Sequence, residues 1–141
     1  MLKQLNPYIH FHRDCAEAIA FYERVLGGKV EMMMKVKDAP PSAQMKPSKE
    51  NENLVLHVRL SVGSYQILAS DWISDQPFQP MHGFSLSLEY PTVDEARKVY
   101  DALSVGAREI RMPLQGTFWA KAFAMFVDQY GTPWMISGAM Q

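Results

Sequence analysis

The sequence lacks several features that would assign a protein to a special class. Among its 141 residues Cys15 is the single cysteine, so no disulfide can form within the chain. No apolar run reaches the roughly 18 residues that a membrane span needs, and the first residues, MLKQLNPY, lack the apolar segment of a signal peptide. The 14 basic and 15 acidic residues nearly cancel, which leaves no positive field for nucleic acid. We therefore expect a cytoplasmic protein with neither a membrane nor a nucleic-acid partner.

Motifs of common enzyme classes are missing as well. The chain contains no GxGxxG loop, no Walker loop and no GxSxG elbow. It also has no glycine-rich strand-to-helix loop of the kind that could hold S-adenosylmethionine. Cys15 is expected in the first turn of a helix, where a thiol usually packs in the core, although a helix N-terminus can in principle lower the pKa of a thiol.

Two helices are predicted from matching capping signals. DCAEAIAFYERVLGG has Asp14 as candidate N-cap, a glutamate three residues later, and a stop at Gly28. TVDEARKVYDALSVG repeats this plan, from Thr92 to Gly106. Both the caps and the stops are 78 residues apart (92 − 14 and 106 − 28). This spacing indicates an internal duplication.

Each half also closes with a predicted β-hairpin. LVLHVRLSVGSYQILASD turns at Gly63, and WAKAFAMFVDQYGTPWMIS turns at Gly131. These turns are 68 residues apart (131 − 63), so the first half carries about ten extra residues. The run DAPPSAQMKPSKENEN, residues 38–53, is predicted to hold them in an exposed, mobile loop.

These elements predict an α+β fold made of tandem βαβββ repeats. The chain is then a single domain, 1–141, with halves at about 1–75 and 80–141. The runs NPYIHFHRDCAEAIAFYERVLGGKVE, ILASD and GTFWAKAFAMFVDQYGTPWMI resemble the vicinal oxygen chelate superfamily, which includes glyoxalase I, extradiol dioxygenases and fosfomycin- and bleomycin-resistance proteins, and in particular its PhnB-like branch. The resemblance covers nearly the whole chain. It implies the glyoxalase/bleomycin-resistance/dioxygenase fold with a curved mixed sheet, a small molecule bound in its concave cleft, and a homodimer.

The same resemblance bears on metal binding. Metal-dependent members hold a divalent cation with His and Glu side chains from the strands, and the matching positions here are Pro7 and Met135. Proline offers no side-chain donor, and a thioether is a soft ligand that suits such cations poorly. His82 falls near a third position and is a weak candidate ligand. We therefore predict no cofactor, with a divalent metal as the less favoured alternative.

A second histidine signal lies on the first predicted strand. His10 and His12 are two residues apart, so both imidazoles point to one face, a spacing that can bind zinc. No cluster of Cys, Asp or Glu accompanies them. We therefore favour the interpretation in which His10 packs beneath the helix and His12 lies at the solvated end of the strand.

A polar row is predicted on one face of the first hairpin. Apolar residues alternate there with His57 and Arg59, and a two-residue turn at Gly63 sets a register in which His57 opposes Ser70. We predict that His57, Arg59 and Ser70 contact a ligand on the concave face. A solvated row on an open antiparallel sheet would show the same pattern. Asp71, which ends the strand, could equally fix the turn or touch a ligand.

The aromatic run of the second half supplies the other candidates. Phe118 and Trp119 are adjacent, so in a strand they point to opposite faces, and Trp119 is the better pocket wall. A core tryptophan is the alternative. With Met135, these two residues complete the predicted ligand-binding set. The ten methionines suit an adaptable pocket wall, although ordinary core packing also explains them.

Three functions remain open, in this order. The first is a small-molecule-binding protein with an aromatic-lined cleft and a degraded metal site. The second is a metal-dependent lyase, isomerase or dioxygenase of the same superfamily. The third is a non-catalytic dimeric interaction module.

Overall fold

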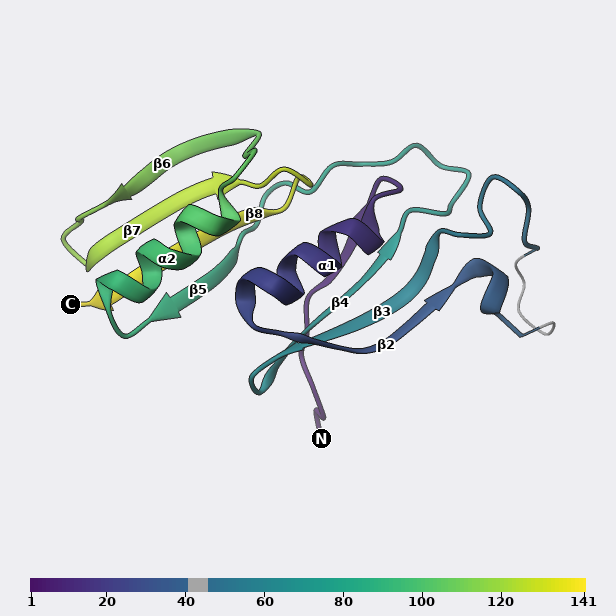
Figure 1. The fold of residues 1–141 in the computed structure, drawn as a ribbon, viewed down its shortest axis with the longest axis horizontal. Helices are drawn as coiled ribbons and strands as arrows, with labels where there is room; N and C mark the ends of the chain where they lie inside the picture. Colours follow the sequence, from purple (N-terminus) through teal and green to yellow (C-terminus); the bar gives the residue numbers. More distant parts are fainter. Residues whose placement is uncertain (41–45) are drawn as a thin grey trace. The chain divides into compact units, whose positions relative to one another are not determined.

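The computed structural model describes residues 1–40 and 46–141, and the chain divides into two compact units, Met1–Gln79 and Pro80–Gln141. Both units have the order strand, helix and three strands (Figure 1), which confirms the predicted α+β fold with two βαβββ repeats. The first unit contains β1 (Tyr8–Phe11), α1 (Cys15–Leu26), β2 (Lys29–Lys35), the short helix η1 (Val36–Asp38), β3 (Val55–Val62) and β4 (Tyr65–Asp71). The second unit contains β5 (Leu86–Tyr90), α2 (Val93–Leu103), β6 (Glu109–Gln115), β7 (Ala120–Val127) and β8 (Pro133–Met140).

Each unit builds a mixed four-stranded sheet. The strand orders are β1-β4-β3-β2 and β5-β8-β7-β6, so the first strand of each unit lies parallel beside the last strand of the hairpin. The β3–β4 register runs from Val58 opposite Ala69 to Val62 opposite Tyr65. The predicted turn at Gly63 and its register are therefore confirmed over this stretch.

The loop predicted for 38–53 is only partly described, because residues 41–45 lie outside the described residues. On the described side, Ser48 and Asn51 hydrogen-bond each other through backbone amides and side-chain oxygens, at 2.7 and 3.2 Å. The Arg13 guanidinium donates to the carbonyl of Glu50 at 2.8 Å. These contacts tie the C-terminal part of the loop to the start of α1.

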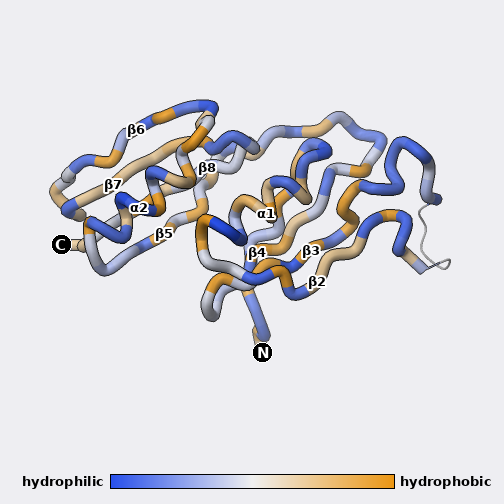
Figure 2. Tube along the Cα trace, in the orientation of Figure 1, coloured by the Kyte–Doolittle hydropathy of each residue, from blue (hydrophilic) through white to orange (hydrophobic). Residues whose placement is uncertain are grey.

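The core of the first unit lies between its sheet and α1. Figure 2 shows hydrophobic and hydrophilic residues alternating along the strands. Successive residues of a strand point to opposite faces, so the buried hydrophobic residues lie on one face of the sheet. The buried residues that form this core come from both layers: Ile9, Phe11, Cys15, Ala18, Ile19, Tyr22, Val58, Leu60, Ile67 and Ala69. Within the described part of the first unit, the opposite face of the sheet carries no helix (Figure 1), and we call the corresponding face of each unit its helix-free face.

In the second unit α2 begins as predicted. The Thr92 hydroxyl oxygen accepts from the Glu95 amide at 3.1 Å and donates to the Glu95 carboxylate at 3.0 Å. The helix then lies very close to β8, since a Cβ built on Gly138 would be 2.7 Å from Cβ of Ala96. Glycine is therefore required at this position by packing, and it fixes which face of β8 the helix covers.

The capping of α1 differs from the prediction. Asp14 stands at the N-cap, but within the described residues its carboxylate makes no capping hydrogen bond. The buried Asp71 carboxylate takes this role: one oxygen accepts from the Cys15 amide at 2.9 Å and the other from the Val55 amide at 2.8 Å. Asp71 therefore fixes the end of β4 to the starts of α1 and β3.

This arrangement predicts a large loss of stability for Asp71→Asn. The amide NH₂ would face one of the two backbone N–H donors, so a buried donor would lose its acceptor, at a cost of about 2–4 kcal/mol. Urea unfolding followed by circular dichroism measures the change. Asp75→Asn, which makes the same substitution at an exposed position nearby, serves as the control. Equal midpoints for the two variants would contradict the role of Asp71.

Candidate functional site

The helix-free face of the first sheet gathers polar and aromatic side chains from β1, β3 and the end of β4. The Tyr8 hydroxyl is hydrogen-bonded to Nδ1 of His57 at 3.1 Å, and the two rings stack with centroids 5.6 Å apart. The His10 Nδ1 and the Ser70 hydroxyl are 3.0 Å apart. Trp72 meets the His10 ring edge-on, with centroids 5.4 Å apart. The Tyr8 and His10 rings, with centroids 5.2 Å apart, join these contacts into one cluster, which we call the polar cluster: Tyr8, His10, His57, Ser70 and Trp72.

The position predicted for His10 is wrong. Ile9 and Phe11 are the residues of β1 that pack beneath α1, so alternation places His10 on the opposite face, where it bonds Ser70. Burial lowers the pKa of His10 below its ordinary value of 6.5, so its imidazole stays neutral at physiological pH. A neutral imidazole can both donate and accept a hydrogen bond.

The three residues predicted from the first hairpin share this face. His57 and Ser70 each belong to the polar cluster, but they bond different partners, Tyr8 and His10. Arg59 is exposed on the same face of β3 and pairs with Leu68 in register. The sequence prediction missed Tyr8 and Trp72. Tyr8 could have been found, because it lies two residues before His10 on the same strand and therefore on the same face.

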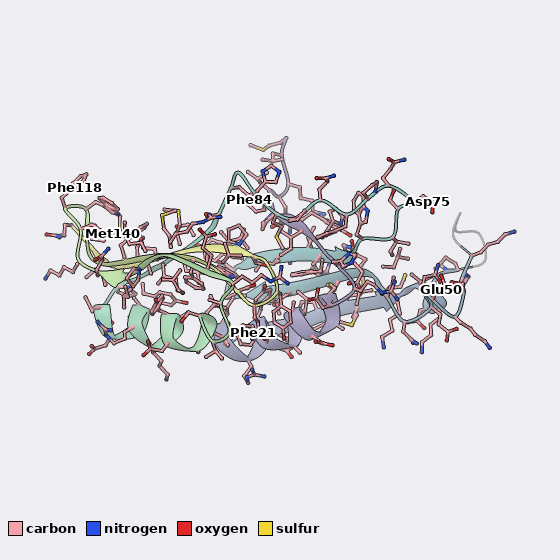
Figure 3. All side chains as sticks on the ribbon, turned by 90° about the horizontal axis from the view of Figure 1, so that it is seen from above. Phe21, Glu50, Asp75, Phe84, Phe118 and Met140 are labelled. Atoms are coloured by element: carbon pink, nitrogen blue, oxygen red, sulfur yellow. The ribbon has the colours of Figure 1, made fainter. Side chains whose placement is uncertain are left out.

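The helix-free face of the second sheet is apolar in its middle, on β7 and β8, whereas Ser87 and Glu89 of the neighbouring β5 are exposed on the same face, opposite Met135 and Ser137. Met135 lies opposite Met125, and the half-buried Trp119 packs edge-on against the buried Phe123 with centroids 5.1 Å apart. Phe118 also contacts Trp119, at 4.7 Å, but its side chain is 89% exposed and lies on the side of the sheet away from α2 (Figure 3). The structure therefore brings Trp119 and Met135 onto one face, with Phe118 at its outer end. The prediction that Phe118 and Trp119 point to opposite faces is wrong, because both residues precede β7, which begins at Ala120. Phe123 and Met125 were missed by the sequence prediction.

The donors at the expected metal positions do not fit a divalent cation. Pro7 offers only its carbonyl, which already accepts from the Leu68 amide at 3.0 Å. Met135 offers a thioether, and His82 is exposed in the segment before β5. Across residues 1–40 and 46–141, no three His, Cys, Asp or Glu side chains come close enough to hold a metal. A hard or borderline cation prefers oxygen and imidazole donors. The carbonyl of Pro7, the thioether of Met135 and the single imidazole of His82 do not provide such a set.

The thiol of Cys15 is unsuited to nucleophilic chemistry. Its side chain is fully buried at the start of α1. Burial first, and then the negative charges of Asp71 and Asp14, raise the pKa of Cys15 far above its ordinary value. The thiol therefore stays protonated, and the helix N-terminus does not activate it.

Comparison with known proteins assigns the family. A model of the Glyoxalase/Bleomycin resistance protein/Dioxygenase superfamily matches residues 4–136. The chain belongs to this superfamily. It is 32% identical over 145 residues to protein YjdN of Escherichia coli strain K12, with 97% of this chain and 96% of that protein covered. None of the helices in the described part of this superfamily member has the length and apolar character needed to cross a bilayer.

Two solved structures extend the comparison. Protein PA1353 from Pseudomonas aeruginosa is 36% identical, covers 97% of this chain and 98% of its own, and superposes with a TM-score of 0.88. A PhnB protein from Bacillus cereus is 21% identical, covers 97% of this chain and 100% of its own, and has a TM-score of 0.75. The second similarity shows the shared fold alone.

The buried thiol gives a prediction for reactivity. We expect Cys15 in the native protein to react with Ellman's reagent at least about a hundredfold more slowly than in unfolded protein, because reaction requires local opening. The native rate is compared with the rate in guanidinium chloride. A rapid, stoichiometric reaction of the native protein would contradict the assignment.

The same group gives a dependence on pH. The unfolded thiol ionises near its ordinary value of 9.0, whereas the folded thiol keeps its proton, so the contribution of Cys15 to stability is complete below pH 9 and is lost as the pH rises further. Urea unfolding midpoints of the wild type should fall between pH 8 and pH 10 more than those of Cys15→Ala.

Proposed function

We propose that this protein binds an apolar or aromatic small molecule on the helix-free face of its second sheet, without using a divalent metal. One observation carries the proposal: Trp119 stays half-exposed while packing on the buried Phe123, beside Met125 and Met135. A fixed indole gives a ligand a broad apolar surface at little cost in side-chain entropy. Burial of apolar surface contributes about 25 cal/mol per Å².

Separately, we propose that the polar cluster and Arg59 of the first unit contact the polar groups of a ligand on the helix-free face of the first sheet. His57, Arg59 and Ser70 remain our proposed polar contacts. The Tyr8 hydroxyl and the neutral His10 offer both donors and acceptors, so the first sheet can accept groups of either kind. Polar groups of this type fix the orientation of the ligand that they contact.

A metal-dependent enzyme of the same superfamily is the alternative. It would need His57, His82 and a carboxylate to come together, and the described residues do not form such a set. A dimeric interaction module without a ligand is the second alternative. In such a module the half-exposed Trp119 would have no role in small-molecule binding. A binding experiment with a Trp119 variant therefore distinguishes the two functions.

The proposal predicts that Trp119→Ala weakens binding of the aromatic probe 8-anilinonaphthalene-1-sulfonate to the native protein by at least about tenfold, which corresponds to about 1.4 kcal/mol. Fluorescence titration measures the affinity. Tyr65→Ala, which truncates an aromatic side chain that is 79% exposed on the first unit, should leave it unchanged. Chelation with EDTA should also have no effect. Equal affinities for wild type and Trp119→Ala would remove the basis of the proposal.

We further propose a cytoplasmic homodimer. Each four-stranded sheet has two edges, and edge strands offer unpaired backbone groups to a second chain. Apolar side chains on edge strands support this reading, since Tyr8 on β1 is 43% exposed and Ile110 on β6 is 44% exposed. Light scattering at micromolar concentration should give twice the chain mass of 16.1 kDa. A monomeric mass would exclude the dimer.

A further inference from the structure

Three methionines form one cross-strand row on the helix-free face of the second sheet. Met112 on β6 lies opposite Met125 on β7, and Met125 lies opposite Met135 on β8. Residues that oppose each other in neighbouring strands carry their side chains on the same face, about 4.8 Å apart in the direction of the ladder. Met125 is therefore one strand spacing from each of the other two. We call these three residues the methionine row.

A shift in the β6 register places Met112 in this row. Ile110 opposes Phe126, whose ring packs edge-on against Tyr100 of α2, so Ile110 lies on the helix side. Simple alternation would put Met112 on the helix side as well. The register shifts by one residue between Ile110 and Met112, and Met112 instead opposes Met125. Register shifts of this kind re-aim side chains and are common beside functional sites.

The surroundings of the row suit a weakly hydrated ligand atom. Met112, Met125 and Met135 are all half-buried. A ligand can therefore reach their thioethers from solvent. On one side the row is followed by the buried Phe123, which opposes Ser137 in the next pair. Methionine has three rotatable side-chain bonds, and the outer two side chains can therefore lean toward the middle one.

We propose that the methionine row binds a soft monovalent cation of the Cu(I) or Ag(I) class. Thioethers are neutral, polarisable donors that select such ions, whereas Mg²⁺, Mn²⁺ and Zn²⁺ prefer carboxylate, water or imidazole. The thioethers are neutral and do not compensate the charge of a bound ion. Burial of a monovalent cation in this half-buried site therefore costs less than burial of a divalent cation. The site shares Met125 and Met135 with the surface proposed for the small molecule, but the cation needs their sulfur atoms, whereas the small molecule needs the indole of Trp119.

The first unit supports this reading by contrast. Its sheet has the same register shift, between Val30 and Met32, and the row that follows contains Met32, Arg59 and Leu68. The guanidinium of Arg59 in the middle of that row repels a cation. Three thioethers in one row are therefore a property of the second unit and not of the repeat itself.

Two measurements on the full chain test the proposal. Transfer of Cu(I) from its bicinchoninate complex, under anaerobic reducing conditions, gives the affinity and stoichiometry. Titration with Ag(I), which needs no reductant, is followed by the ¹³C-methyl resonances of the methionines. We expect one ion per chain, and the three methyl groups of the methionine row should shift before those of the other seven methionines.

Substitutions locate the ligands. Met125→Leu keeps nearly the same volume and should weaken Cu(I) binding at least about tenfold. Met140→Leu changes the same residue type on β8 at a position paired with Ala120, outside the row, and should bind as wild type does. Cys15→Ala should also bind normally, which separates the row from the one thiol of the chain. Unfolding midpoints establish that each variant is folded.

Several outcomes would overturn the proposal. These are the absence of Cu(I) transfer to the wild type, normal affinity in Met125→Leu, loss of binding in Cys15→Ala, or displacement of the ion by equimolar Zn²⁺ or Mn²⁺. Loss of aromatic-probe binding in Trp119→Ala with Cu(I) affinity intact would leave both proposals standing. Normal probe binding in that variant, with Cu(I) bound by the row, would reject the proposed function alone.

Discussion

Two buried carboxylates hold the ends of the hairpins, and the arrangement of both sheets depends on them. Asp71 accepts hydrogen bonds from the backbone amides of Cys15 and Val55, at 2.9 and 2.8 Å. Asp128 accepts from two amides of the β7–β8 turn, at 2.8 and 3.0 Å, and from the indole N–H of Trp134 at 2.8 Å. A buried carboxylate is tolerated only when such donors surround it, and these charge-assisted bonds are the stronger kind. Asp71 therefore fixes the end of β4 to the starts of α1 and β3, and Asp128 fixes the turn between β7 and β8.

Once the helix side of each sheet is fixed, the other side is free to carry function. In the first unit the free side holds histidine, tyrosine and serine in mutual hydrogen bonds, whereas in the second unit it holds methionine and aromatic rings. The two repeats share backbone order, register and even the shift in the second strand. Chemical differences between the units therefore lie in the side chains and not in the fold.

Local signals allowed much of the fold to be predicted from sequence. The cap at Thr92 and the turn at Gly63 each depend on residues within a few positions of one another, and both are confirmed. The cap of α1 could not be predicted in the same way, because its acceptor, Asp71, is 56 residues away from Cys15 in the chain. The face of His10 was also misassigned. Strand β1 has only four residues, so its alternation is too short to tell the helix side from the free side.

The sequence predicted the faces of the candidate site residues correctly only where the register between neighbouring strands is regular. His57, Arg59 and Ser70 were placed on one face because an uninterrupted hairpin obeys strict alternation. Met112 does not obey it, since a one-residue shift in β6 reverses its side, and no local sequence feature marks that shift. The row that results joins Met112 to Met135, which stands where the family resemblance places a carboxylate. Replacing a carboxylate by a thioether removes one negative charge and two hard oxygen donors from the sheet. The thioethers that remain are uncharged and polarisable, so they can favour apolar molecules and soft ions by the same physical property, while a divalent cation lacks its preferred donors there.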